Sequence, residues 1–572
     1  MTVAVVGSGP AVEAVEAALA DVDVPVATSG IDGIADATFA VVVGLAGSDG
    51  FEQANRVAVD AGVPWVAVEL GGVGGRPMDD VSAAVSGFTP DSGCYHCLRT
   101  RVDAAAEGDP ASRPTATKSD ARLAGAVAGR RVVGSLSGDP FAGEVVELPH
   151  ARRRFLPVPG CPVCDGERDR TLLREHRAVG LENALGRAEL AVDDRVGVVT
   201  GVGEQHSFPA PYYLAVSGDT AGFSDASAAS QAAGVGADWN EAYMKALGEA
   251  LERYSAGVYR EAEFTVAPAE DVANPVTPGR FVRPDGYPDL DPDEAVAWVP
   301  GEELSSGDPA HLLAEFVQFP PPEERFKPAI TTGLGLGNSP VEAMLSGLYE
   351  VVERDATMLA WYSTFEPMGL SVADETFRTV ARRARAEDLS VTPLVVTQDV
   401  DVPVVAVAVH RDGDWPRFAL GSAADLDAAA AARSALTEAL QNWMELRSMG
   451  PDRSREAGGA IGRYADLPRE VRGLVDVDET VPAASVGPAD VPTGADELDA
   501  VVGRLADAGV ETYAARITPR DIDSLGFEAV RVLAPEAQPL FTGDAYFGER
   551  AKTVPRDLGF RPRLDRPYHP YP

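Results

Sequence analysis

The chain has 572 residues, more than one hydrophobic core usually supports, so its length predicts two or three domains. Acidic residues outnumber basic ones by 88 to 49, giving a formal net charge of −39, yet the acids are scattered and 45% of residues are hydrophobic, which excludes a disordered protein. The same charge argues against a general nucleic-acid binder, because neutralising phosphates requires a basic surface.

Nearly all basic residues are arginines; the lysines are Lys118, Lys245, Lys327 and Lys552. An aspartate-rich, lysine-poor surface keeps a protein soluble in concentrated salt, so we expect a halophilic source. No segment approaches the roughly 20 apolar residues that cross a bilayer, and no basic leader precedes the apolar N-terminus. We therefore expect a cytoplasmic protein that does not associate with membranes.

Residues 1–180 predict an α/β domain. Apolar runs at 2–6, 39–47 and 63–70 indicate buried strands, and a helical pattern follows the first of them. The turn Gly7-Ser8-Gly9 begins a dinucleotide-binding fingerprint, but Val12 occupies the third glycine position, so the pattern is incomplete and weak. Residues 103–129, rich in Ala, Asp, Pro and Ser, predict a loop or a short helix.

All four cysteines lie in two C-x2-C pairs, Cys94 with Cys97 and Cys161 with Cys164. This spacing lets successive thiolates reach one tetrahedral Zn²⁺, and a site with no open position is structural. The alternatives are buried thiols and a redox pair. The redox alternative is less favoured because neither pair is expected to open a helix directly after a strand. We predict a structural zinc tetrathiolate.

Residues 187–572 predict a second domain of α+β layers. Strands are expected at 195–202, 212–218, 393–398, 403–410, 511–518 and 528–535, and long helices around 249–253, after 337 and at 428–447. The proline-rich stretch 266–327 predicts an irregular surface excursion, and the chain end predicts an unpatterned tail.

The pentad Glu-x-x-Glu-Arg occurs twice inside helical patterns, at 249–253 and 350–354. Residues three apart are neighbours on a helix, so Glu249 and Glu252 can present two carboxylates to one point. Glu342 precedes Glu353 by three turns plus roughly 20°, which places both on one stripe. Four such carboxylates favour Mg²⁺ and nucleotide phosphates. The alternative for a single pentad is a solvated face with local ion pairs.

Together these motifs resemble the YcaO superfamily, ATP-dependent enzymes that activate peptide backbone amides, and in particular the cyclodehydratases of thiazole- and oxazole-modified microcins and bacteriocins. The resemblance covers about residues 190–572. The first domain resembles the zinc-bearing, E1-like and thus Rossmann-like domain often fused in front of YcaO domains. The segments that carry the YcaO resemblance are ALGEALERYSAG, GLGNSPVEAMLSGLYEVVERDA, AAARSALTEALQNW, ITPRDI, VRVLAP and the end HPYP.

The resemblance implies a set of site residues. Mg²⁺ would be held by Glu249, Glu252, Glu342 and Glu353, with Glu350 the less favoured ligand. ATP would be contacted by Asn338, Arg354, Arg433, Glu438 and Gln441. A helix N-terminus after a glycine-rich turn attracts phosphate, and arginines neutralise charge on the transferred phosphoryl group. The alternatives are a buried ion pair of Arg354 with Asp355 and an ordinary surface position for Gln441.

The implied reaction is cyclodehydration. A Cys, Ser or Thr side chain of a ribosomally made precursor peptide attacks the preceding carbonyl, the oxyanion takes the γ-phosphate of ATP, and loss of phosphate leaves an azoline. Family members end in Pro-x-Pro-x-Pro and use the terminal carboxylate as a base. Here Pro570 and Pro572 match, whereas Tyr568 replaces the first proline. Val235 replaces a family lysine between two glycines, and Lys245 could supply that charge.

The implied partners are the precursor peptide, a leader-peptide-binding protein, a flavin dehydrogenase and a second copy of the chain in a homodimer. A separate leader-binding protein is considered because the first 90 residues show no winged-helix pattern. The alternatives are thioamide formation with a sulfur-delivery partner, a non-catalytic scaffold that binds peptides or proteins, and an adenylating E1 reaction.

Overall fold

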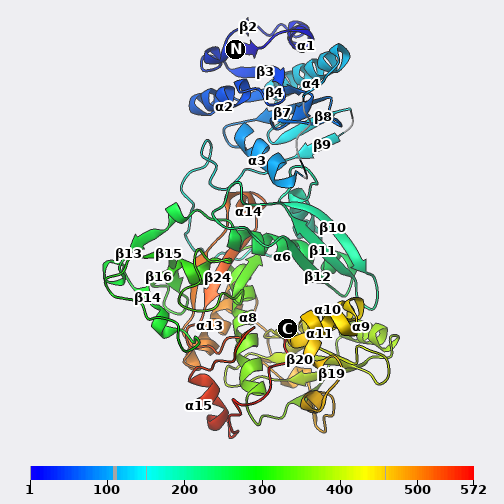
Figure 1. The fold of residues 1–572 in the computed structure, drawn as a ribbon, viewed down its shortest axis with the longest axis vertical. Coiled ribbons are helices and arrows are strands. Elements are labelled where there is room, and N and C mark those ends of the chain that lie inside the picture. The colour runs from blue at the N-terminus through cyan, green and yellow to red at the C-terminus, as the bar shows by residue number, and fades with distance from the viewer. Residues whose placement is uncertain (1, 107, 109–112, 150, 458) are drawn as a thin grey trace.

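The computed structural model describes residues 2–106, 108, 113–149, 151–457 and 459–572. A smaller α/β part, coloured blue to cyan, lies at one end of the long axis, and a larger α+β part holds the C-terminus (Figure 1). No helix in the described ranges is long and apolar enough to cross a membrane.

The N-terminal part is a seven-stranded sheet between two layers of helices. Neighbouring strands β2, β1, β3 and β4 are parallel, and the remaining strands are antiparallel. Helices α1 and α4 cover one face, and α2 and α3 cover the other. In spatial order the strands are β2 (Val26–Thr28), β1 (Val3–Val6), β3 (Phe39–Leu45), β4 (Trp65–Leu70), β7 (Ala83–Phe88), β8 (Glu144–Leu148) and β9 (Ala151–Arg154); the helices are α1 (Pro10–Ala20), α2 (Gly50–Ala61), α3 (Tyr95–Ala105) and α4 (Lys118–Leu136). A short hairpin, β5 (Gly72–Val73) and β6 (Arg76–Pro77), follows β4.

Helix α4 corrects the prediction of a loop or short helix over 103–129. Its small residues form a packing face against α1, where a Cβ on Gly125 would lie 2.1 Å from the Ala11 carbonyl oxygen. A capping box between Thr117 and Asp120 begins the helix. The small residues of this stretch suggest a loop by composition, but in the structure they allow α4 and α1 to approach closely.

The larger part contains three strand-then-helix units: β12 (Gln231–Val235) with α6 (Trp239–Gly257), β17 (Leu334–Gly337) with α8 (Pro340–Trp361), and β21 (Phe418–Ala424) with α10 (Ala428–Met449). A glycine in each strand allows close contact with the helix: a Cβ on Gly234, Gly335 or Gly421 would lie 2.1, 2.1 or 2.4 Å from helix backbone. Each helix also contacts the strand of another unit, α6 with β17, α8 with β21 and α10 with β12. The three units therefore close a ring.

Each unit belongs to a different sheet. Their strands are β10 (Val199–His206), β11 (Tyr212–Ser217) and β12 in the first sheet; β14 (Pro275–Val276), β16 (Pro309–Leu313), β15 (Val296–Glu303), β23 (Tyr513–Arg516), β24 (Glu528–Leu533) and β17, with β13 (Thr265–Ala267) on β15, in the second; and β21, β20 (Val404–His410), β19 (Ser390–Val395), β18 (Met368–Ser371) and β22 (Thr480–Pro482) in the third. The remaining α-helices are α5 (Leu181–Ala188), α7 (Ala314–Val317), α9 (Glu375–Arg385), α11 (Pro451–Ala457), α12 (Gly459–Tyr464), α13 (Ala495–Asp507), α14 (Arg520–Ser524) and α15 (Arg550–Asp557).

Two expectations for this part were incomplete. The proline-rich stretch 266–327 contributes β15 and β16 to the second sheet, because its prolines lie mostly outside those strands. The chain end is not wholly unpatterned, since α15 packs against α8. The predicted strands near 403–410 and 528–535 and the helix at 428–447 are confirmed within a few residues.

Candidate active site and four-cysteine cluster

The first pentad lies on α6 beside β12. Glu249 accepts hydrogen bonds from the Ala233 backbone N–H at 3.1 Å and from the Arg253 guanidinium at 3.3 Å. Burial raises the pKa of Glu252 to about 8, and the neighbouring carboxylates of Glu350 and Glu249 add to that effect while Arg253 opposes it. The two glutamates of this pentad are thus close to one another and to the second pentad.

The second pentad lies on α8. Glu353 is buried, accepts a 2.7 Å hydrogen bond from the Ser422 hydroxyl, and lies 3.4 Å from the Arg354 guanidinium. Burial raises its pKa to about 8; Arg354 opposes the shift, and Glu438 and Glu350 add to it. Glu350 accepts from the Gly333 N–H at 3.0 Å and lies 3.8 Å from Arg354. Arg354 therefore lies between Glu353, which is buried, and Glu350, which is partly buried.

Asn338 and Glu342 form a pair at the start of α8. Glu342 accepts from both the backbone N–H and the side-chain amide of Asn338 at 3.0 Å. Arg187, from α5, donates to the Asn338 side-chain oxygen and, at 2.8 Å, to the Gly526 carbonyl. This end of α8 combines a helix N-terminus, a carboxylate and a guanidinium from a distant segment.

Helix α10 supplies the third side of the site. Glu438 accepts from the Ser422 N–H at 2.7 Å, and burial raises its pKa; Arg354, the Ser422 amide and Lys245 oppose the shift. Gln441 donates to Glu445 at 3.0 Å, and Tyr212 donates to the same carboxylate at 2.9 Å. The structure places Gln441 in this polar group, while Lys245 lies close enough to Glu438 to act on its charge.

Arg433 is engaged elsewhere. It forms a 2.8 Å ion pair with Asp374, the residue that caps α9. Its guanidinium therefore has a carboxylate partner outside the group of Glu353, Glu438 and Arg354. Asp355, weighed as a partner of Arg354, instead pairs with Arg550 at 2.7 Å, because consecutive helix residues point about 100° apart.

The C-terminal tail ends inside the site. Arg354 donates to a terminal oxygen of Pro572 at 2.8 Å. Pro570 is buried, and Trp361 holds the Pro567 carbonyl at 2.8 Å. Tyr568, at the first-proline position, donates to the Phe541 carbonyl at 2.5 Å and stacks on His569 with ring centroids 4.2 Å apart. Aromatic packing thus fixes the tail where a proline is missing.

The acidic residues do not form one compact metal cluster. In the described part of the chain, the only group of three or more metal-type ligands whose atoms all lie within 4.8 Å of one another is the four cysteines. The glutamates are spread over α6, α8 and α10, and backbone amides hold Glu249, Glu342 and Glu438 in place. The arrangement therefore fits separate cation positions rather than a single point.

Sequence reasoning overlooked several charged residues near this site: Glu241, Glu445, Arg187 and Arg531, the last of which opposes the raised pKa of Glu252. Glu241 had a usable signal, because it precedes the first pentad by the interval at which Glu342 precedes the second. In the structure it accepts from the Ala237 N–H at 3.0 Å and pairs with Lys245 at 3.0 Å. Glu445 follows Gln441 by one helical turn on α10, whereas Arg187 and Arg531 come from segments that meet the site only through the fold.

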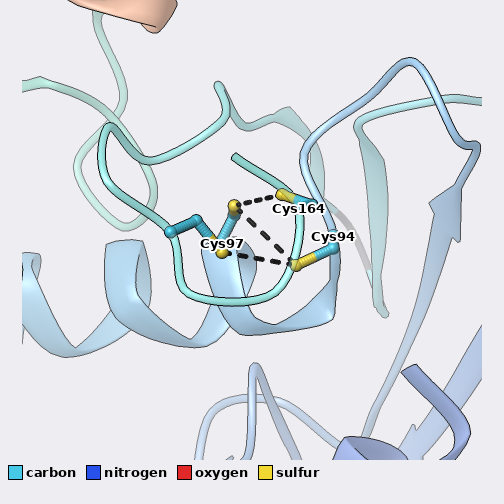
Figure 2. A group of neighbouring side chains, drawn as sticks. Cys94, Cys97 and Cys164 are labelled. Carbon is cyan, nitrogen blue, oxygen red and sulfur yellow. Dashed lines mark hydrogen bonds between the residues drawn. The ribbon is translucent and has the colours of Figure 1, made fainter. Parts of the chain in front are cut away.

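The four cysteines converge between α3 and the loop after β9 (Figure 2). The sulfur atom of Cys94 lies 3.9 Å from the sulfur of Cys97 and 3.7 Å from the sulfur of Cys161. The sulfur atoms of Cys97 and Cys164 are 3.5 Å apart. Four thiolates about 2.3 Å from a tetrahedral Zn²⁺ would lie roughly 3.8 Å apart. The geometry therefore fits one ion. Cys94 lies at the N-cap of α3, but residues 89–93 separate it from β7, so this pair opens a helix without directly following a strand.

A cavity of about 880 Å³ adjoins the tail. Its walls are the end of α8 and the following turn, the segment 470–479, and tail residues 561–571. Arg566 lies 3.7 Å over the Trp361 ring and donates to the Trp361 carbonyl at 2.8 Å. Burial raises the pKa of Tyr571; Arg566 opposes this shift and Glu353 adds to it. Tyr571 thus lies between the cavity and the acidic site.

Comparison with known proteins places these features in context. Residues 233–538 match the model of the YcaO cyclodehydratase family, described as ATP- and Mg²⁺-binding. An uncharacterized protein of Methanothermobacter thermautotrophicus is 28% identical over 339 residues, 56% of this chain and 85% of that protein.

Two solved structures share the fold over almost the whole chain. A heterocyclase in complex with substrate and cofactor matches with a TM-score of 0.74 at 20% identity, covering 98% of this chain and 83% of its own. The heterocyclase TruD matches with a TM-score of 0.66 at 18% identity, covering 98% and 82%. At these identities the matches establish the fold, and function must be argued from the site.

Proposed function

The chain belongs to the YcaO cyclodehydratase family and is an ATP-dependent enzyme, and from that premise we propose that it converts Cys, Ser or Thr residues of a ribosomally made precursor peptide to azolines. The observation that carries this proposal is the terminal oxygen of Pro572 on Arg354, beside Glu353 and Glu350. A carboxylate at that place can accept the proton of the attacking side chain and of the amide nitrogen.

We assign Mg²⁺ binding to Glu249, Glu252, Glu342 and Glu353. The pKa values near 8 at Glu252 and Glu353 support this assignment, because buried carboxylates that repel one another are stabilised by a cation. Mg²⁺ prefers carboxylate oxygens and phosphates, and when bound it would offset charge on the nucleotide. Glu350 lies among the same acids and is the first alternative ligand.

ATP would be held by Asn338 and Arg354, with Glu438 and Gln441 nearby. Asn338 lies at the N-terminus of α8, where backbone N–H groups favour phosphate. Arg433 was also expected to contact ATP. For a direct contact with ATP, the ion pair of Arg433 with Asp374 must open; if this ion pair stays closed, Arg433 supports α10 instead.

The reaction balances with one ATP per ring. The substrate side chain adds to the preceding carbonyl and loses its proton to the Pro572 carboxylate; the resulting oxygen anion takes the γ-phosphoryl group, releasing ADP. Loss of the amide proton then expels phosphate and leaves the C=N bond of the azoline. Arg354 is placed to orient the terminal carboxylate.

We place the substrate peptide in the cavity beside the tail. A volume of about 880 Å³ is typical of ligand pockets, and it reaches Tyr571, one residue from the terminal carboxylate. Its lining includes Arg561, Arg563 and Arg566 on the tail and Asp476 and Asp478 opposite. Walls of both signs suit a peptide backbone, which offers both hydrogen-bond donors and acceptors.

For the rest of the chain, we propose an E1-like zinc-bearing domain over 1–180, supported by parallel strands followed by the four-cysteine cluster, and a YcaO domain over 187–572. The family reaction also suggests a leader-peptide-binding protein, a flavin dehydrogenase acting on the azoline, and a homodimer as partners.

Incubation with ATP, Mg²⁺ and a co-encoded Cys-rich peptide tests the proposed reaction. We expect each ring to lower the peptide mass by one water and to produce one ADP. A mass gain that matches exchange of oxygen for sulfur would indicate thioamide formation, and AMP would indicate adenylation. Glu342→Ala should abolish turnover and leave the zinc content unchanged; retained turnover would contradict the site assignment.

A further inference from the structure

The four-cysteine cluster contacts the larger domain through helix α14. Arg520 donates to the Cys164 carbonyl at 2.8 Å and lies 3.4 Å from the Cys164 sulfur and 3.7 Å from the Asp165 carboxylate. A guanidinium from the larger part thus contacts a cysteine of the N-terminal part, and it can donate to a thiolate there.

The residue after Arg520 belongs to a buried group of three side chains. Asp521 is fully buried and accepts hydrogen bonds from Arg101 and, at 2.6 Å, from the Tyr254 hydroxyl. Arg101 also donates to Tyr254 at 3.3 Å and to the Pro157 carbonyl at 2.9 Å. Buried charges of this kind must be paired, so the geometry of each partner depends on the others.

The three side chains come from three different elements. Arg101 lies one turn after Cys97 on α3, so both share a helix face. Tyr254 follows Glu252 by two residues on α6, the helix of the first acidic pentad. Asp521 lies in the ITPRDI segment, to which the proposed reaction assigns no role. A continuous path of contacts therefore joins the cysteines to the acidic helix.

We propose that Arg101, Asp521 and Tyr254 are positioning residues through which a metal ion on the four cysteines fixes helix α6, so that filling the cysteine site strengthens Mg²⁺–nucleotide binding. The proposal rests on the proposed function for its nucleotide and goes beyond it by giving the cysteine site an effect on the ATP site. By linkage the effect is reciprocal: bound Mg²⁺–nucleotide must retain the thiolate-bound metal more tightly.

Two neighbouring hydroxyls on α6 offer a matched pair of variants. Tyr254→Phe removes the hydroxyl that contacts Asp521 and Arg101, whereas Ser255→Ala removes a buried hydroxyl that, among the described residues, donates to the Leu251 carbonyl of its own helix. We measure the Kd of a Mg²⁺ complex of a non-hydrolysable ATP analogue by calorimetry, with zinc content determined for each protein. Tyr254→Phe should raise this Kd about fivefold or more with zinc content unchanged, and Ser255→Ala should leave it within about twofold.

Metal extraction with 1,10-phenanthroline, with Mg²⁺ restored afterwards, completes the cycle. In the wild type it should raise the Kd about fivefold or more, and in Tyr254→Phe by less than about twofold, because the path is already broken. Equal Kd values for the two variants, or independent effects of extraction and substitution, would overturn the proposal.

Amide exchange of residues 239–257 provides a second readout that needs no nucleotide. Extraction of the thiolate metal should speed exchange in this helix of the wild type and of Ser255→Ala more than in Tyr254→Phe. If the wild type bound no Mg²⁺–nucleotide, the proposed function would fail, and the exchange experiment would still decide whether the cysteine site fixes α6. Unchanged exchange after extraction would refute that.

Discussion

At Glu252 and Glu353, the Mg²⁺ that we propose to bind there would compete with protons for the same carboxylate oxygens. Burial raises both pKa values to about 8 from the usual 4.5, so each group binds more protons in the folded than in the unfolded state between these values. Their contribution to stability is complete below about pH 4.5 and is lost as the pH rises through about 8. We predict that Mg²⁺ raises the Tm more at about pH 9 than at about pH 6.

Differential scanning calorimetry of wild type and Glu353→Gln, with and without Mg²⁺, measures this effect. The comparison with the variant is needed because burial lowers the pKa of Lys327 to about 7, which gives a stability slope of opposite sign above that pH. Part of the fall in Tm with pH, and part of the Mg²⁺ response, should be absent in Glu353→Gln. Identical pH profiles of the Tm for the two proteins would exclude a role for Glu353 in the pH dependence of stability and in the response to Mg²⁺.

Single residues also mark the limit of sequence reasoning. Glu249, Glu252 and Glu353 could be placed on helix faces from the pentads, because helical periodicity relates positions a few residues apart, whereas the role expected of Arg354 came only from the family resemblance. The Arg433–Asp374 ion pair could not, since a helix and the cap of another helix meet there only in three dimensions. The hydrogen bonds that Ser422 makes with Glu353 and Glu438 are hidden for the same reason.

Among the elements, the tail gives the sharpest test of mechanism. Its terminal carboxylate contacts Arg354, and its position is fixed by buried His569, Pro570 and Tyr571. Appending two alanines after Pro572 moves the carboxylate and leaves every tail contact residue in place. We expect turnover to fall by about two orders of magnitude or more, the size of effect typical of losing a general base, with little change in Tm.

Turnover of precursor peptide, with Tm as the control for folding, measures the outcome. A matched control is Arg556→Ala, an exposed α15 residue outside the cavity, which should leave turnover unchanged. If the extended protein were fully active, the terminal carboxylate could not be the base, and another group near Arg354 would have to accept the proton.

Two elements show how the repeated pentads arise. The N-cap residue, the strand glycines and the glutamates of unit β12–α6 each recur in unit β17–α8 after the same number of residues. The repeat in the sequence therefore reflects a repeat in the structure. The third unit, β21–α10, has no pentad, and its place in the ring follows only from its packing on α8 and β12. Helix α4 was likewise hidden, because its small residues resemble those of a loop until α1 packs against them.

At the scale of the whole molecule, the net charge of −39 makes stability depend on salt. Repulsion among surface carboxylates is screened as the Debye length falls from about 10 Å at 0.1 M to about 3 Å at 1 M salt. We predict that the Tm rises steadily between 0.1 and 2 M KCl, as scanning calorimetry would show. A Tm that is constant or falls over this range would contradict the expected halophilic adaptation. Sucrose at matched osmolarity, which screens no charge, is the control.

The sequence by itself determined the local features: the alternation that builds the strands, the helices with their acidic stripes, the two cysteine pairs and the family to which 233–538 belong. These depend on residues near one another in the chain. Only the tertiary structure decided which features meet: the ring of three strand-and-helix units, the terminal carboxylate on Arg354, and the Arg101–Asp521–Tyr254 group between the cysteines and α6. Such contacts join segments hundreds of residues apart, and packing of the folded chain, not periodicity, brings them together.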